Sequence, residues 1–290
     1  MSENVVIVGP GRMGLALGAA LMQARAVERL IFYGRSLEPP PHPIFEPAEL
    51  TAEYRIGPHP VPSGTTVLIL AVPDRALAEV AYDLSLTGPA PPGCAAFHLS
   101  GALSTEVLAP LHGVGYTVGS IHPLQSVADP WLSGDRLMGS AFAIAGEPAA
   151  ISAARRVVDE LGGKAIVIAP KRRPVYHAAA SVASNFQVAL LAFAVRLMGE
   201  AGVSEEEALP ALIPLVRGTL DNLEHLGVPA ALTGPIPRGD VDTVRLHLAQ
   251  LSPEDRVLYC ALGRELLRIA RLAGLDEQRA LELETLLAAH

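Results

Sequence analysis

The residues with the clearest chemical meaning are the glycines near the start of the chain. The segment Gly9-Pro10-Gly11-Arg12-Met13-Gly14 follows a short β-branched run and opens a helical stretch, which is the setting in which this spacing binds a dinucleotide. Gly9 permits a tight turn, Gly11 lets the backbone approach a pyrophosphate, and Gly14 allows close packing of helix on strand. We therefore expect Gly9, Gly11, Arg12, Met13 and Gly14 to bind a cofactor. The alternative is a glycine turn that keeps the fold without a ligand.

The choice of dinucleotide is expected to depend on Arg35 and Ser36, which follow the second predicted strand, Leu30–Tyr33. An NAD site normally has an acidic residue here, whereas arginine binds a 2′-phosphate through charge-assisted hydrogen bonds. The sequence therefore predicts NADP in preference to NAD. The alternative is that Arg35 is a solvated loop charge. Ala71, Val72 and Pro73 end the next strand, where the ribose and diphosphate are expected to cross the sheet.

Polar side chains follow two later strands. Ligands of open α/β sheets bind outside the carboxyl ends of the strands, so Ser100, Gly101 and Gln125 are expected to contact substrate, and Ser100 also the cofactor. His122 ends its strand beside the expected nicotinamide position and titrates near neutral pH, which makes it a candidate acid or base. The alternative for His122, and for His98, is a structural histidine that fixes a turn.

The helical half of the chain offers a second polar group. His177, Ser181, Ser184 and Asn185 lie within about a quarter-turn of one predicted helix face, and burying them without partners would be costly. We expect them to line a wet cleft; the alternative is that they pair with one another and the neighbouring domain. Arg238, in a segment rich in glycine and proline, is a candidate anchor for a substrate carboxylate or a cross-dimer contact; the alternative is a turn with a local salt bridge. Asp240 is a candidate cap for the helix that follows.

Two domains are expected to position these groups. Residues 1–169 alternate short apolar strands with helices, which is typical of βαβ units, and this predicts an α/β domain with a doubly wound parallel sheet. The proline-rich segment Leu37–Pro47 is expected to be an extended surface loop. Residues 170–290 are predicted to be all-helical, with helices near 174–200, 204–226, 240–250, 253–273 and 276–289. The stretch Val188–Met198 is apolar nearly all round and should be buried, at a subunit interface.

Composition excludes several classes of protein. The 290-residue chain is 50% hydrophobic and 18% charged, and its net charge of −8 includes no basic block that would bind nucleic acid. Its longest apolar run, Val188–Val195, is far shorter than the ~20 residues that span a bilayer. The sequence opens without signal-peptide features, and Cys94 and Cys260 are isolated. We expect a cytoplasmic protein with no membrane contact and no metal site.

Five segments, VVIVGPGRMG, HLSGALS, SIHPLQS, YHAAASVASN and TGPIPRGD, occur in this order. Together they resemble the bacterial family that joins a Rossmann-like NADP-binding domain to a C-terminal helical domain of unknown function. That family looks like a branch of the group containing pyrroline-carboxylate reductase, β-hydroxyacid dehydrogenases, ketopantoate reductase and phosphogluconate dehydrogenase. The resemblance implies a Rossmann-type sheet, a C-terminal domain similar to that of phosphogluconate dehydrogenase, and a homodimer formed through the helical domain.

The resemblance also implies an NADP-dependent oxidoreductase acting on a small polar carbonyl, hydroxy acid or imine, without naming the substrate. β-Hydroxyacid dehydrogenases carry a catalytic lysine in the first long helix of the second domain; here Asn185 fits, but the only local lysine is Lys171, before that helix. The expected catalytic residues are therefore His122, His177, Ser181 and Asn185, with the acid/base role open between the two histidines. The alternative function is a non-catalytic NADP-binding sensor or scaffold that dimerises through its helical domain.

Overall fold

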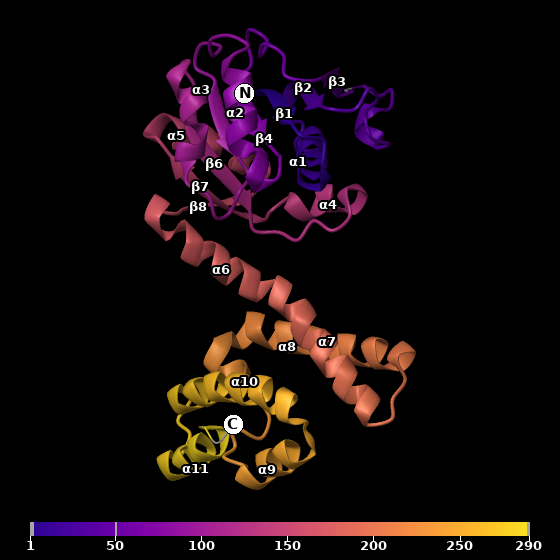
Figure 1. The fold of residues 1–290 in the computed structure, drawn as a ribbon, viewed down its shortest axis with the longest axis vertical. Helices are drawn as coiled ribbons and strands as arrows, with labels where there is room; N and C mark the ends of the chain where they lie inside the picture. The colour runs from indigo at the N-terminus through magenta and orange to yellow at the C-terminus, as the bar shows by residue number, and fades with distance from the viewer. Residues whose placement is uncertain (1–2, 50, 289–290) are drawn as a thin grey trace. The chain divides into compact units, whose positions relative to one another are not determined.

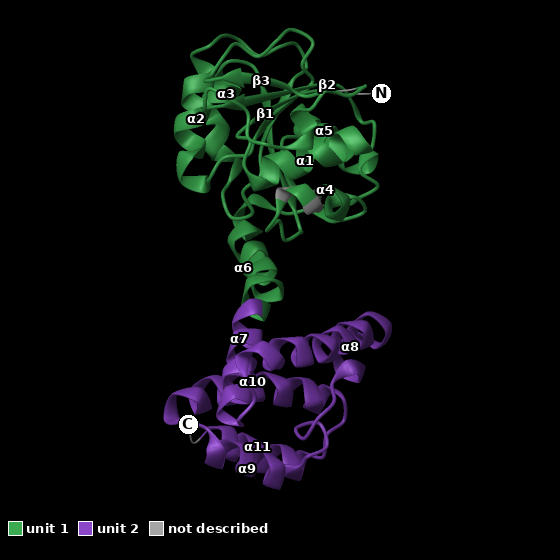
Figure 2. Ribbon diagram, turned by 90° about the vertical axis from the view of Figure 1, so that its right-hand side faces the viewer, with its two compact units in different colours: residues 1–187 green, residues 188–290 purple. Residues whose placement is uncertain are grey.

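The chain divides into two compact units, Met1–Gln187 and Val188–His290, in a computed structural model that describes residues 3–49 and 51–288 (Figure 2). The units divide inside helix α7 (Asn185–Glu200), whereas the boundary expected from sequence precedes helix α6 (Arg173–Ala183). The observed division assigns α6 to the first unit, whereas the expected boundary assigns it to the second domain. The difference arises because α6 is in contact with the strand ends of the first unit. The domain boundary near residue 170 stays a prediction.

The first unit is built on one eight-stranded sheet with the order β3-β2-β1-β4-β5-β6-β7-β8 (Figure 1). Its strands are β1 (Glu3–Val8), β2 (Val27–Gly34), β3 (Glu53–Ile56), β4 (Val67–Leu70), β5 (Ala95–His98), β6 (Thr117–Pro123), β7 (Ala141–Gly146) and β8 (Lys164–Val167). The order of the first six is the Rossmann order, in which ligands bind where β1 and β4 diverge. The predicted fold class is confirmed.

Helices cover both faces of this sheet. Successive strand residues point to opposite faces, so Val5 and Ile7 pack into one core and Val6 into the other. The first core lies under α1 (Arg12–Gln23), α4 (Pro130–Leu137) and α5 (Pro148–Glu160), and the second under α2 (Leu77–Ser85) and α3 (Ala109–Gly113). This double covering explains why the strands are continuous apolar runs in the sequence.

Three details of the sheet and its loops differ from expectation. The sheet is not wholly parallel, because β7 runs antiparallel to β6. The edge strand β3 was not expected. It pairs with β2 in parallel, and Arg29 of β2 forms an ion pair with Glu53 of β3 at 2.6 Å. The proline-rich segment contains a short 3₁₀ turn, Pro43–Phe45, that buries Ile44, so the expectation of a wholly extended surface loop is wrong.

The second unit is helical, as predicted. After α7 it contains α8 (Glu205–Ala231), α9 (Val241–Gln250), α10 (Pro253–Leu272) and α11 (Glu277–Ala288), and α9, α10 and α11 share a core. Helix α8 continues past the predicted end at residue 226 through a kink at Gly227, whose φ is 75°. Asp240 caps α9 by accepting a hydrogen bond from the Thr243 amide, which confirms that expectation. Residue 289 of the last predicted helix lies outside the described residues.

The apolar stretch Val188–Met198 is not covered by its own chain, because no described residue of α7 is buried, and its expected burial at a subunit interface stays a prediction. Within the longer segment Pro170–Glu200 the most apolar 18-residue window has a mean hydropathy of 1.7, so this segment is long and apolar enough to cross a membrane by length and composition alone. It is interrupted at Ser184, between α6 and α7, and bears polar side chains on α6.

Candidate functional site

The glycine turn has the geometry expected of a dinucleotide cradle. Gly9 has a φ of 104°, and a Cβ there would lie 2.6 Å from the Ala71 carbonyl oxygen. A Cβ at Gly14 would overlap the Gly9 carbonyl oxygen, so the first helix packs closely on its strand. Around Gly11 the space is open, and no side chain caps α1 there. The first amides of α1 therefore remain available to an anion, which fits a pyrophosphate.

One cavity of about 740 Å³, here called the β2 cavity, lies beside this turn. Its lining includes five residues expected to bind cofactor beyond the glycines: Arg35, Ser36, Ala71, Val72 and Pro73. It also includes a second arginine, Arg75, which the sequence reasoning missed although it follows Asp74 directly. Tyr54 Oη donates a 2.8 Å hydrogen bond to the Ser36 carbonyl and so fixes the loop that carries Arg35.

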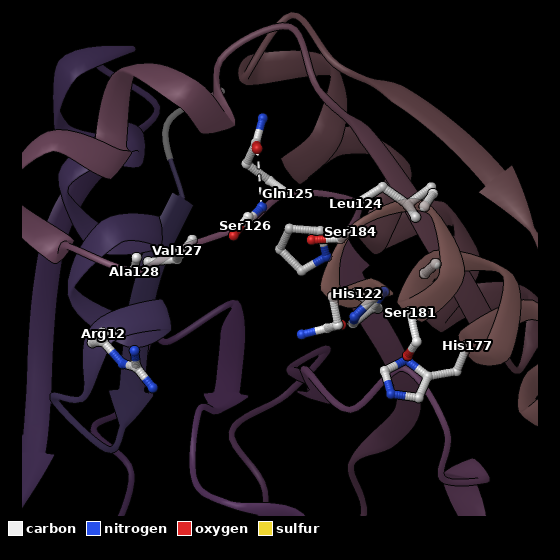
Figure 3. Close-up of a pocket in the computed structure, with 14 residues that line it drawn as sticks. Arg12, His122, Leu124, Gln125, Ser126, Val127, Ala128, His177, Ser181 and Ser184 are labelled. Atoms are coloured by element: carbon white, nitrogen blue, oxygen red, sulfur yellow. Dashed lines mark hydrogen bonds between the residues drawn. The ribbon is translucent and has the colours of Figure 1, made fainter. Parts of the chain in front are cut away.

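A second cavity of about 590 Å³, here called the histidine cavity, is lined by Arg12, the residue that follows Gly11 of the β2 cavity. Its polar lining is drawn in Figure 3 and consists of Arg12, His122, Gln125, Ser126, His177, Ser181, Ser184 and Asn185. The four polar residues predicted to share one helix face all line this cavity, from α6, its C-cap Ser184 and the first residue of α7, together with the strand-end residues His122 and Gln125. Their chemical roles stay predictions.

His122 is held by a partner that the sequence reasoning did not single out. Tyr176 Oη lies 2.6 Å from His122 Nδ1, and the two rings meet edge to face. Burial raises the pKa of Tyr176 to about 12, so its hydroxyl keeps its proton. Within the described residues that hydroxyl has no other hydrogen-bond acceptor, so it donates to Nδ1. The proton of neutral His122 is then on Nε2.

Both buried histidines next to this site are held neutral. Burial lowers the pKa of His122 to about 4, and the neighbouring His177 and Arg173 act in the same direction. Burial also lowers the pKa of His98, whose side chain is 0% exposed, to about 4. At neutral pH His122 is therefore a hydrogen-bond donor through Nε2–H and not an imidazolium.

Gly101 marks the point at which the two cavity histidines converge. A Cβ at this position would overlap His177 Nδ1 and lie 2.9 Å from His122 Nε2. The two imidazole rings are 5.6 Å apart between centroids. His177 Nδ1 is buried and has no hydrogen-bond partner among the described residues. Glycine is needed here because any Cβ would meet these ring nitrogens, and the expected contact of Gly101 with substrate stays a prediction.

Arg173 joins the start of α6 to the loop after β5. Its side chain is 0% exposed, its Nε donates a 2.8 Å hydrogen bond to the Leu103 carbonyl, and its Nη2 donates to the Ser100 carbonyl. The Ser100 hydroxyl in turn donates to Asp74 Oδ2 at 2.7 Å. Because Tyr176 and His177 lie one turn beyond Arg173 on α6, this tether sets their position against His122. Nothing in the sequence pattern marked Arg173 as buried.

The remaining predicted site residues have different surroundings. Gln125 lines the histidine cavity, but its amide donates to the Arg136 carbonyl in the last turn of α4. Met13 packs against the first core, and the Ser100 hydroxyl also accepts from the Ala102 and Leu103 amides of its own loop. Arg238 is exposed and lies in the second unit. No described residue group has the three or more ligands that a metal ion would need.

The lowered histidine pKa values predict a stability loss in acid. The unfolded histidines titrate near 6.5 and the folded ones near 4, so only the unfolded state takes up protons between these values. The free energy of unfolding, fully present above pH 6.5, should fall by about 2 kcal/mol per histidine at pH 5. Urea unfolding at pH 8 and pH 5 measures this. His98→Asn should reduce the difference in unfolding free energy between the two pH values. His225→Asn, at an exposed position, should leave this difference as in wild type. Equal stability of the wild-type protein at both pH values would contradict the prediction.

Comparison with known proteins supports the two-part organisation. Residues 2–123 match the Rossmann-like domain, and residues 140–266 match the domain of unknown function DUF2520.

Protein TM1727 from Thermotoga maritima is 26% identical with a TM-score of 0.69, covering 92% of this chain and 98% of its own. A Bacteroides fragilis protein provisionally named an NADP oxidoreductase is 20% identical (TM-score 0.63, coverage 94% and 98%). Pyrroline carboxylate reductase of Plasmodium falciparum, solved with NADP bound, is 14% identical (TM-score 0.58, coverage 98% and 97%). A search among curated proteins finds no match.

Proposed function

We propose that this chain, a Rossmann-like domain followed by a DUF2520 domain, is an NADP(H)-dependent oxidoreductase acting on a small polar carbonyl, hydroxy acid or imine. The observation that carries the proposal is that two consecutive residues of the glycine turn line the two cavities, Gly11 the β2 cavity and Arg12 the histidine cavity. A dinucleotide bound at the glycine turn would extend from Arg35 in the β2 cavity to His122 in the histidine cavity. The named NADP(H) reductases of the same fold support this choice.

The β2 cavity supports NADP as the preferred cofactor. Arg35 and Arg75 both line it, and Ser36 stands beside them. Two guanidinium groups can bind the 2′-phosphate through charge-assisted hydrogen bonds, while the carboxylate that an NAD site uses on the ribose is missing at position 35. The diphosphate would lie over Gly11, where the backbone amides of α1 are free.

In the histidine cavity, His122 is the proposed proton donor. When bound, NADPH supplies the hydride to the substrate carbon. The Nε2–H of His122 donates a hydrogen bond to the carbonyl oxygen or imine nitrogen and gives its proton to that atom as negative charge develops. Nε2 then takes a proton from solvent, while the Tyr176 hydroxyl keeps its own proton and its hydrogen bond to Nδ1. Ser181 on α6 and Asn185 at the start of α7 supply neutral hydrogen-bonding groups that orient the substrate.

The test of the proposal combines binding with turnover. Fluorescence titration should give a saturable NADPH complex that is tighter than the NADH complex. Oxidation of NADPH should then be measured against a panel of small oxo acids, imines and aldehydes, and reduction of NADP⁺ against hydroxy acids. Turnover of at least one class is expected. Tight NADPH binding without turnover of any class would favour the non-catalytic sensor, and absence of NADPH binding would refute both.

Gly101→Ala should lower this turnover by about 100-fold, because the new methyl group displaces the His122 and His177 ring nitrogens by a fraction of an ångström or more. NADPH affinity should change little, since Gly101 does not line the β2 cavity. The measurement is kcat with the best substrate of the panel. Gly113→Ala is the matched control, because a Cβ there meets nothing within 4 Å. Wild-type kcat in Gly101→Ala would contradict the converging geometry.

We also propose that the protein is soluble and cytoplasmic and forms a homodimer through its helical unit. Helix α8 supports this, since its only described buried residues are Ala208 and Ala231 while Leu215, Leu220 and Leu226 are each more than half exposed. An exposed apolar surface of this kind is typical of an oligomer interface. Sedimentation in detergent-free buffer should show a dimer that Leu215→Arg dissociates. Leu86→Arg, at an equally exposed position beyond α2, should leave it intact; a wild-type monomer at micromolar concentration would contradict the dimer.

A further inference from the structure

The charge of the histidine cavity is unusual for this protein. The whole chain carries a net charge of −8, yet none of the described residues that line this cavity is acidic, and Arg12 is the one lining residue whose charge is fixed at neutral pH. The β2 cavity, by contrast, includes Glu38, Glu79 and Asp83 among its lining residues. The potential inside the histidine cavity is therefore locally positive.

Arg12 is free to bind a ligand there. Within the described part of the chain its guanidinium forms no ion pair and no hydrogen bond. Figure 3 shows Arg12 extending from α1 on one side of the cavity, with His122, Ser181 and His177 on the other. A substrate whose reacting group lies at His122 would thus have the Arg12 guanidinium on the opposite side of the cavity. The sequence had assigned Arg12 to the cofactor because it lies between the motif glycines.

We propose that the substrate is a small carbonyl or imine compound with a carboxylate group, and that Arg12 binds this carboxylate while His122 faces the reacting atom. The inference rests on the proposed function. An arginine guanidinium donates two parallel hydrogen bonds to a carboxylate. The neutral serine, asparagine and glutamine side chains around it would not distinguish a charged ligand from a neutral one. A cationic amine would meet no carboxylate in this cavity and is disfavoured.

A diphosphate crossing Gly11 is the competing partner for Arg12, and the two roles differ in what the arginine controls. A carboxylate anchor changes the affinity for the substrate and leaves that for NADPH in place. A diphosphate clamp changes the affinity for NADPH and NADH together. Arg12→Gln separates them, because glutamine keeps a polar side chain that can donate hydrogen bonds and removes the charge.

The experiment measures binding of three carboxylates and their neutral amides to the protein–NADP⁺ complex by calorimetry: oxamate and oxamide, pyrrole-2-carboxylate and pyrrole-2-carboxamide, acetate and acetamide. At least one carboxylate should bind at least tenfold more tightly than its amide. Arg12→Gln should weaken that carboxylate by 10- to 100-fold, as expected for lost charge-assisted hydrogen bonds. Its NADPH affinity should stay within twofold of wild type, and Arg155→Gln, at an exposed site on α5 outside both cavities, should match wild type throughout.

Two results would overturn the inference. One is a wild-type protein that binds no carboxylate in preference to its amide, or an Arg12→Gln variant that keeps the preference. The other is an Arg12→Gln variant whose main defect is in NADPH affinity, which would assign Arg12 to the diphosphate. Failure of the proposed function appears separately, as a wild-type protein that forms no NADPH complex.

Discussion

Replacing His122 with asparagine is expected to lower kcat for NADPH oxidation by about 10²- to 10⁴-fold, which is the usual contribution of a positioned proton donor. Asparagine places an oxygen near the position of Nδ1, so the hydrogen bond from Tyr176 can persist while Nε2–H is lost. NADPH affinity should change little, because the groups expected to bind the 2′-phosphate and diphosphate line the β2 cavity and are left intact. The measurement is kcat and KM with the best substrate, alongside fluorescence titration of NADPH.

His122→Gln is the informative partner variant. Its terminal amide reaches the position of Nε2, so it should keep part of the hydrogen bonding to substrate and be less impaired than His122→Asn. Because the pKa of His122 is about 4, the wild-type kcat should show no inflection near pH 6.5. Wild-type kcat in both variants, or a rate that follows an acid group titrating at pH 6.5, would contradict the assignment of neutral His122 as donor.

The second large effect is expected at Arg35. Arg35→Ala should weaken NADPH binding by about 10- to 100-fold, because it removes charge-assisted hydrogen bonds to the 2′-phosphate, and should leave NADH binding nearly unchanged. Arg75→Ala should act in the same direction, and the double variant should abolish most of the preference for NADPH. The measurement is the dissociation constant of each cofactor by fluorescence titration.

Arg155→Ala, on the exposed surface of α5, is the control for a general effect of lost positive charge. If Arg35→Ala weakens the binding of NADPH and of NADH equally, Arg35 does not bind the 2′-phosphate. A loss confined to Arg75→Ala would move the recognition of this phosphate from the end of β2 to the loop after β4.

The fold was largely predictable because its signals are local. The glycine spacing, the apolar runs of the parallel strands and the periodic helices are each set by a few neighbouring residues, and they match the observed elements closely. The edge strand β3 was missed because Glu53–Ile56 is short and alternates charged with apolar residues at a half-exposed edge. The direction of β7 was missed because a buried strand has the same apolar pattern in either orientation.

The site was predictable in its candidates but not in its contacts. His122, His177, Ser181 and Asn185 were named from sequence, and all line one cavity. Their surroundings could not be predicted, since these depend on residues far apart in the chain. Tyr176 is hydrogen-bonded to His122 across 54 positions, and Arg173 to Ser100 across 73. Such contacts need the three-dimensional fold, because no local pattern distinguishes a buried arginine from an exposed one.

The most direct test of the account is a crystal structure of the protein with NADP⁺ bound. The account predicts the 2′-phosphate beside Arg35 and Arg75, the diphosphate over Gly11, and the nicotinamide ring in the histidine cavity, next to His122 Nε2. A nicotinamide ring that lies outside the histidine cavity, or a 2′-phosphate without contact to either arginine, would contradict it.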